Sequence, residues 1–256
     1  MSAVMTIAGL VMKEIFRKRD FYVALVLTGV ILGYAERLQF YQVNNISRYL
    51  MEMGLTLIFL FSVILTSALA ARQFPSEIQN RTGPLLLAKP VTRMQFVLGK
   101  YLGSFFAGAS AFGIFYAIFT GVVWMKAGQI SWELAFQAFY LFLLNLMVLS
   151  AMVSAFSYGM TVGANVTVSL TMYLLINTYG AHFKESAASF PAFSKLICSA
   201  AYFLWPHFEF FDLRHRFIHD WPALPWTLMG VITLYALAYT SAFLLWAVVS
   251  LNKKSL

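Results

Sequence analysis

Three histidines are the residues of this chain best suited to bind a metal ion or haem. His215 and His219 stand four residues apart in the run R-H-R-F-I-H-D, and His207 precedes them. On a helix this spacing places both imidazoles on one face, as in zinc and haem sites. Their neighbours are typical of a membrane interface, where cations snorkel and aromatic rings form a belt: Arg214, Arg216 and Trp221. With no H-E-x-x-H motif, no metal site is predicted, and a membrane enzyme or haem-handling protein is kept as the alternative interpretation.

Two further patterns match known motifs only in part. Residues 98–101, L-G-K-Y, resemble the end of a phosphate-binding loop, but Met94 stands where a glycine is required and Tyr101 where Ser or Thr is required. The serines within apolar runs lack a G-x-S-x-G context: Ser154, Ser157 and Ser169. The chain is therefore predicted to have no catalytic residues and to bind no nucleotide or other cofactor itself.

Composition places the chain among integral membrane proteins. Hydrophobic residues make up 61% of its 256 residues, charged residues make up 11%, and the mean hydropathy is +0.74. A soluble domain carries about 25% charged residues, so this chain has too few polar side chains to cover a soluble surface. Its single cysteine, Cys198, excludes an internal disulfide and a cysteine-rich metal cluster.

Hydropathy predicts an all-α fold with six membrane-spanning helices in one transmembrane domain, residues 1–256. The predicted spans are 20–41, 49–72, 96–125, 134–158, 162–181 and 226–251. Ahead of them, apolar residues recur every three or four positions between Val4 and Ile15, and basic residues follow. This pattern predicts an amphipathic helix within residues 1–19 that lies along the cytoplasmic membrane surface, with an extension of the first span as the alternative.

The distribution of charge predicts the orientation of the spans. With the N-terminus inside, the cytoplasmic segments hold eleven Lys and Arg residues against three acidic residues, and the outer segments hold seven against seven. The net charge of +8 then lies on one face, which is the positive-inside asymmetry. This asymmetry explains the pI of about 9.6 without nucleic-acid binding, and it predicts that both termini are cytoplasmic.

The longest outer connection, residues 182–225, is apolar. Residues 196–213 are rich in aromatic and aliphatic side chains, and Pro191 and Pro206 interrupt the segment. Irregular backbone at membrane depth must be covered by protein or water. The segment is therefore predicted to form short re-entrant helices before the last span. Three tryptophans are expected in the aromatic belt at that surface: Trp205, Trp221 and Trp226.

Small and polar residues inside the spans predict helix packing and one candidate translocation surface. A stripe of small residues lets another helix approach the third span, either within the subunit or between subunits: Gly99, Gly103, Ala107 and Ala111. Intramembrane amides and hydroxyls usually bond neighbouring helices, but they can also line a path for a polar substrate. The candidate surface in the fourth and fifth spans comprises Asn145, Asn165, Thr167, Thr171 and Asn177.

A basic polar segment, Arg72–Gly103, separates the second and third spans. It holds five cations, three prolines and a run of three leucines that is too short to cross a bilayer. Such a segment must lie in water or against protein, since lipid cannot satisfy its polar groups. It is predicted to bind a soluble protein partner, and lipid headgroups are the alternative.

The motifs of this segment resemble those of ABC transporter permeases of the ABC-2 type. They read Glu77, then Arg81-Thr82, Leu85-Leu86-Leu87, Pro90-Val91-Thr92-Arg93, Gln95 and Gly99-Lys100-Tyr101-Leu102-Gly103. Family members commonly show an acidic residue, G-T, a leucine run, P-[VI]-[ST]-R and G-K-[FY]-L-G in this order. This chain has Asn80-Arg81 before Thr82, where many members carry a glycine, and Gly83-Pro84 after it. The order of spans and the apolar outer segment extend the resemblance over the whole chain.

The resemblance implies a permease subunit of an ATP-driven exporter in the bacterial cytoplasmic (inner) membrane. It implies a homodimer in membrane lipid with two copies of a separate ATPase subunit, which would bind ATP and Mg, and it implies no nucleic-acid partner. Residues 73–95 are then expected to form a coupling helix seated on the ATPase. The residues expected to contact the ATPase or mark the turn back into the membrane are Glu77, Ile78, Arg81, Thr82, Leu85, Leu86, Leu87, Pro90 and Arg93.

Overall fold

The computed structural model describes residues 3–17, 22, 26, 29–30, 46–73, 92–127, 131–186, 205–219 and 221–253. Within these ranges all regular structure is helical, as predicted, and no strand is found. The elements are α1 (Ala3–Arg17), α3 (Ile46–Arg72), α6 (Arg93–Ala127), α7 (Trp132–Phe156), α8 (Val162–Ser186), the 3-10 helix η2 (Phe208–Phe211), α10 (Arg214–Ile218) and α11 (Trp226–Lys253).

Four helices of the described ranges are long and apolar enough to cross a bilayer. They are Glu52–Arg72, Arg93–Met125, Trp132–Phe156 and Trp226–Asn252, and they confirm the helices predicted at 49–72, 96–125, 134–158 and 226–251. The span predicted at 162–181 falls in α8, whose apolar part, Val162–Asn177, is shorter. Most of the span predicted at 20–41 lies outside the described residues, so the arrangement of six spans stays a prediction.

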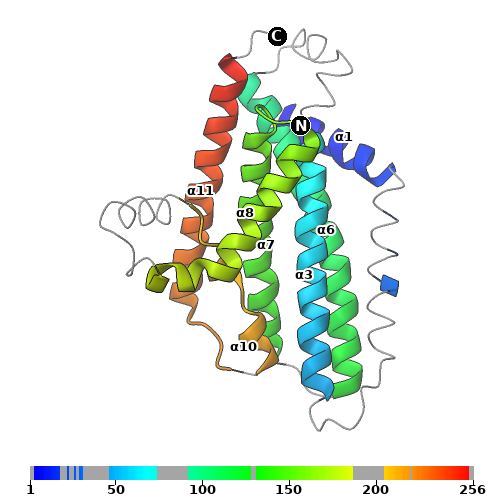
Figure 1. Ribbon diagram of the computed structural model, residues 1–256. Coiled ribbons are helices and arrows are strands. Elements are labelled where there is room, and N and C mark those ends of the chain that lie inside the picture. Colours follow the sequence, from blue (N-terminus) through cyan, green and yellow to red (C-terminus); the bar gives the residue numbers. More distant parts are fainter. Residues whose placement is uncertain are drawn as a thin grey trace.

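Helix α7 forms the centre of the bundle and contacts α3, α6, α8 and α11 (Figure 1). Its apolar window is 72% buried inside the protein, against 22% for α11. A helix that is apolar on all faces packs among other helices. The ring of Phe142 stacks on Phe59 of α3 with centroids 3.8 Å apart, and it lies 4.5 Å from the ring of Phe112 of α6. α7 is therefore the helix against which the rest of the bundle is positioned.

Helix α1 packs across α6 at the end of the bundle where α11 terminates (Figure 1). A Cβ added at Gly99 would lie 2.7 Å from the Cβ of Ile7, and one added at Gly103 would lie 2.5 Å from the Cβ of Val11. The predicted helix within residues 1–19 is thus present, and its apolar face packs against α6. The glycines of the small-residue stripe serve packing within the chain, which is one of the two alternatives that the sequence left open.

The returning segment, Trp205–His219, packs into the bundle between α8 and α11. Phe208 and Phe211 of η2 are fully buried, and η2 contacts α7 and α8. The Tyr239 hydroxyl donates a hydrogen bond of 3.4 Å to the Trp205 carbonyl. Because Tyr239 lies about 20 Å along α11 from its first residue, the segment reaches the middle of the bundle. Its re-entry into the membrane stays a prediction, and residues 187–204 and 220 fall outside the described ranges.

Candidate functional site

The segment expected to bind an ATPase is framed by described residues at both ends. Residues 74–91 lie outside the described part of the chain, and with them Glu77, Ile78, Arg81, Thr82, Leu85, Leu86, Leu87 and Pro90. Thr92 directly follows these residues, and Arg93 is the first residue of α6. Five residues at the two ends form a group that we call the helix junction: Gln73, Thr92, Arg93, Gln95 and Lys100.

Lys100 joins α6 to the end of α3. Its ammonium donates a hydrogen bond of 2.5 Å to the backbone carbonyl of Gln73, the residue after α3. The last carbonyls of a helix lack partners within the helix and carry its partial negative charge, so a cation stabilises them. The Lys100 side chain is only 4% exposed, and its Nζ lies 5.1 Å from the ring centroid of Phe96. A buried ammonium needs such an acceptor, because burial without one is costly.

A capping box fixes the start of α6. The Thr92 amide donates to Gln95 Oε1 at 3.0 Å, and the Gln95 amide donates to Thr92 Oγ1 at 3.2 Å. These reciprocal bonds satisfy two amides that have no partner in the first helical turn. The T-x-x-Q spacing is visible in the sequence and would have placed the helix start at Arg93, three residues before the predicted span boundary.

Arg93 joins α6 to α11. Its Nη1 donates to the backbone carbonyl of Leu251 at 3.1 Å and to Asn252 Oδ1 at 3.4 Å. The contact is made in the last turn of α11, where carbonyl groups again lack helical partners. The helix junction thus connects three helices through residues that flank 74–91 in the sequence.

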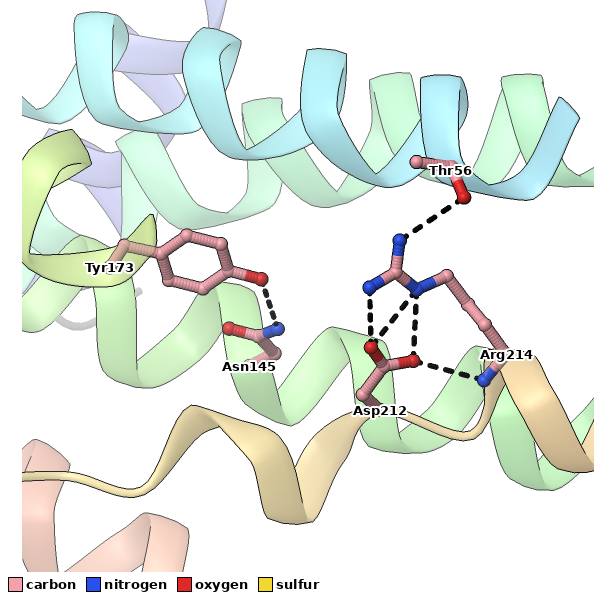
Figure 2. A network of polar contacts seen from close by, with 5 residues as sticks. All are labelled: Thr56, Asn145, Tyr173, Asp212 and Arg214. Atoms are coloured by element: carbon pink, nitrogen blue, oxygen red, sulfur yellow. Dashed lines mark hydrogen bonds and ion pairs between the residues drawn. The ribbon is translucent and has the colours of Figure 1, made fainter. Parts of the chain in front are cut away.

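A second group of polar residues lies where the returning segment meets α3, α7 and α8 (Figure 2). We call it the polar cluster: Thr56, Asn145, Tyr173, Asp212 and Arg214. Arg214 Nε lies 2.9 and 3.0 Å from the two carboxylate oxygens of Asp212, and its Nη2 lies 2.5 Å from Oδ2. Its Nη1 donates to Thr56 Oγ1 at 3.2 Å. The hydrogen bond to Thr56 attaches the returning segment to α3, and the ion pair within the segment orients the Arg214 side chain for it.

Arg214 is turned into the protein, and the prediction that it snorkels at the membrane surface is wrong. Its guanidinium lies 5.5 Å from the ring centroid of Phe59, and the side chains of Arg214 and Asp212 are 19% and 18% exposed. Burial alone would lower the pKa of Arg214, but the hydrogen bonds and charge of Asp212 outweigh burial and raise that pKa. The guanidinium is therefore held charged although it lies over an aromatic ring of the core.

The residues of the candidate translocation surface divide between the interior and the outside of the bundle. Asn145 is 2% exposed and donates from Nδ2 to the Tyr173 hydroxyl at 3.0 Å. Asn165 is fully buried and donates to the Val153 carbonyl at 3.0 Å and to Ser157 Oγ at 2.8 Å. Both amides thus join α8 to α7, which is the packing role that polar residues often have between membrane helices.

Three members of that surface lie on other faces of α8. Thr167 and Thr171 are exposed and stand one turn apart, and Asn177 is half-buried. Thr167 Oγ1 donates to the Gly163 carbonyl of its own helix at 2.9 Å. The structure therefore brings Asn145 and Asn165 into helix packing and leaves Thr167 and Thr171 on an exposed face, so the five residues do not form one continuous surface.

The tryptophans and Gln137 show how the outer segment is attached. Trp205 packs against Phe156 of α7 with ring centroids 6.3 Å apart, whereas Trp221 and Trp226 are exposed as expected for belt residues. Trp205 is thus half-buried against α7, and its position relative to the membrane surface stays a prediction. Gln137 of α7 donates from Nε2 to the Leu224 carbonyl at 3.0 Å and accepts from the Leu224 amide at 2.9 Å.

The three histidines do not come together. His207 is buried, and its Nδ1 lies 3.1 Å from the Tyr235 hydroxyl of α11. Burial lowers the pKa of His207 below its ordinary value. His215 and His219 are exposed neighbours with ring centroids 6.4 Å apart. Over the described ranges, no group of three or more His, Cys, Asp or Glu side chains could hold a metal ion.

Comparison with protein families matches residues 5–256 to the family described as ABC-2 family transporter protein. No curated protein matches the chain. The matched region includes all of the described elements except the first two residues of α1, and also the segment 74–91 with its basic motif.

Proposed function

Because that match spans nearly the whole chain, the protein belongs to the ABC-2 family of transporter proteins, and we propose that it is the permease subunit of an ATP-driven exporter. Family membership and the long apolar helices together make it a multi-pass membrane protein with a transport role. Its own residues would form the transmembrane path, and a separate subunit would bind ATP and Mg and hydrolyse the ATP.

The observation that carries this proposal is the helix junction, whose residues flank the basic segment 74–91 in the sequence. A soluble ATPase can act on the transmembrane helices only through a surface that is mechanically connected to them. Lys100, Arg93 and the capping box of α6 connect both ends of the segment to α3, α6 and α11. We therefore assign the coupling role to the segment, with Glu77, Arg81 and Thr82 as its main contacts to the ATPase.

The proposal is tested by co-purification with an ATPase encoded by an adjacent reading frame that carries G-x-x-x-x-G-K-[ST]. The unmodified chain is expected to bind this subunit, and Glu77→Ala or Arg81→Ala is expected to abolish binding. Glu133→Ala is the matched control, since Glu133 is an exposed acid in the first turn of α7. Full binding by both segment variants would overturn the coupling assignment.

Dimerisation, location and direction belong to the same proposal. We expect a homodimer bound to two ATPase subunits in the bacterial inner membrane, with both termini cytoplasmic. Helix α11 exposes large apolar side chains, Val231, Leu234 and Leu245 among them, which suits contact with lipid or a second copy. If the protein is an exporter, ATP should drive uptake of the transported substrate into inside-out vesicles. Uptake of that substrate only into right-side-out vesicles would contradict export.

The exposed face of α8 is the remaining candidate for a translocation surface. Thr167 and Thr171 present hydroxyl groups there, whereas Asn177 is half-buried on a different face of the helix. Asn145 and Asn165 would support this surface from behind through their bonds to Tyr173, Val153 and Ser157. The alternative of a haem- or metal-handling protein has no comparable support, because His207 is bound to α11 apart from the exposed pair His215 and His219.

A further inference from the structure

Two cations of one helix reach the ends of two other helices. Lys100 binds the carbonyl that follows α3, and Arg93 binds a carbonyl in the last turn of α11. Both belong to α6 and are separated by about two helical turns, which places them on one side of that helix. Gln73 directly precedes the segment 74–91 and Thr92 directly follows it.

Each contact resists separation of the helices that it joins. A hydrogen bond from an ammonium or guanidinium group is about twice as strong as a neutral one. If α3 moved away from α6, the nearly buried Lys100 would lose its 2.5 Å bond to the Gln73 carbonyl. If α11 moved away, Arg93 would lose both the Leu251 carbonyl and the Asn252 side chain.

We propose that Lys100 and Arg93 are positioning residues that make the ends of α3, α6 and α11 move as one unit when the segment 74–91 is displaced. The assumption that a bound ATPase displaces the segment rests on the proposed function. The attachment of the three helices to one another is independent of that function. Force applied to the segment would thereby reach α11, although α11 is distant from the segment in sequence.

The test measures distances between nitroxide labels in the full chain with Cys198→Ser as background. The labels replace exposed residues of the three helices: Ile64, about two turns before the end of α3, Met94 in the first turn of α6 and Val249 near the end of α11. Without nucleotide, Lys100→Met is expected to broaden the distance distribution of the 64–94 pair and to leave the 94–249 pair narrow. Arg93→Met is expected to do the reverse, and Arg93→Lys, which keeps a cationic donor, is expected to retain the narrow 94–249 distribution.

Lys13→Met is the matched control, since Lys13 is an exposed cation of α1. Distributions in Lys100→Met and Arg93→Met as narrow as in this control would overturn the attachment. Arg93 is only half-buried, so its variant keeps the proposal testable if Lys100→Met does not fold.

A second arm uses the complex with the co-expressed ATPase, to which ATP and vanadate are added. With the natural Lys100 and Arg93, both distances are expected to stay constant, and Lys100→Met is expected to make the 64–94 distance depend on nucleotide. A nucleotide-dependent 64–94 distance that is already present with both natural residues would overturn joint movement. If no ATPase binds the chain, the proposed function fails, while the nucleotide-free arm still decides whether the two cations hold the helices together.

Discussion

Asn165 Nδ2 donates a hydrogen bond of 2.8 Å to Ser157 Oγ, across the short turn that joins α7 to α8. The same amide nitrogen lies 3.0 Å from the Val153 carbonyl, and Ser169 Oγ donates to Asn165 Oδ1 at 3.1 Å. One fully buried side chain therefore holds the start of α8 to the last turn of α7. This contact separates the structural amides of α8 from the hydroxyl groups on its exposed face.

Asn165→Leu is expected to destabilise the protein, because it leaves Ser157 and Ser169 hydroxyls without their amide partner in a buried site. The expected loss is about 1–3 kcal/mol in the free energy of unfolding, the range for a buried polar group left unsatisfied. Thermal denaturation in one detergent measures it. Thr167→Val on the exposed face of the same helix is the control, with an expected change within about 0.5 kcal/mol. Equal losses in both variants would contradict the division of α8 into two faces.

Gly99→Ala and Gly113→Ala are expected to act in opposite directions although both lie in α6. A Cβ at position 99 would lie 2.7 Å from Ile7, so α1 must shift, at a cost of about 1–3 kcal/mol. At position 113 nothing lies within 4 Å of the added Cβ. There alanine should stabilise by up to about 1 kcal/mol through its higher helix propensity. Melting temperatures of the two variants that change in the same direction would contradict close packing of α1 on α6.

The long apolar runs made α3, α6, α7 and α11 predictable, because a run of about 20 apolar residues is typical of a membrane-spanning helix. The spacing of Gly99 and Gly103 predicted that another helix approaches α6 closely. It could not predict that this helix is α1, since small residues do not identify the helix that packs on them. The capping box at Thr92 and Gln95 was readable from their spacing alone.

The polar residues were harder to place from the sequence. Asn165 and Thr167 stand two positions apart in a helix whose sequence shows no distinct apolar face. Which of the two is buried therefore depends on which side of α8 packs against α7. Arg214 and Thr56 are distant in sequence, and their contact exists only because the returning segment packs back into the bundle. A basic residue beside tryptophans is typical of a membrane surface, and tertiary packing overrode that pattern here.

The Asp212 and Arg214 side chains are expected to stabilise the protein jointly, so that the stability losses of the two single variants do not add. Asp212→Asn leaves the Arg214 guanidinium over Phe59 without its anion, and Arg214→Met leaves the carboxylate without its cation. Each change should cost about 1–3 kcal/mol, while the double variant should cost less than the sum of the two. A double-mutant cycle on thermal stability measures the coupling. A coupling energy near zero would show that the two side chains do not stabilise each other.

His207 is expected to make stability depend on pH. It belongs to the returning segment and to no spanning helix, and burial lowers the pKa of its imidazole in the folded state. The unfolded chain then binds a proton more readily than the folded chain. Any stability that His207 contributes is therefore fully present above the unfolded pKa of about 6.5 and is lost as pH falls through the lower folded pKa. Thermal denaturation of the unmodified protein between about pH 5 and 8 should show this loss of stability toward low pH. The His207→Gln variant should not show it. His219→Gln, at an exposed histidine of the same segment, is the matched control. If the His207→Gln curve runs parallel to that of the unmodified protein over the whole range, the buried imidazole is not the group that titrates.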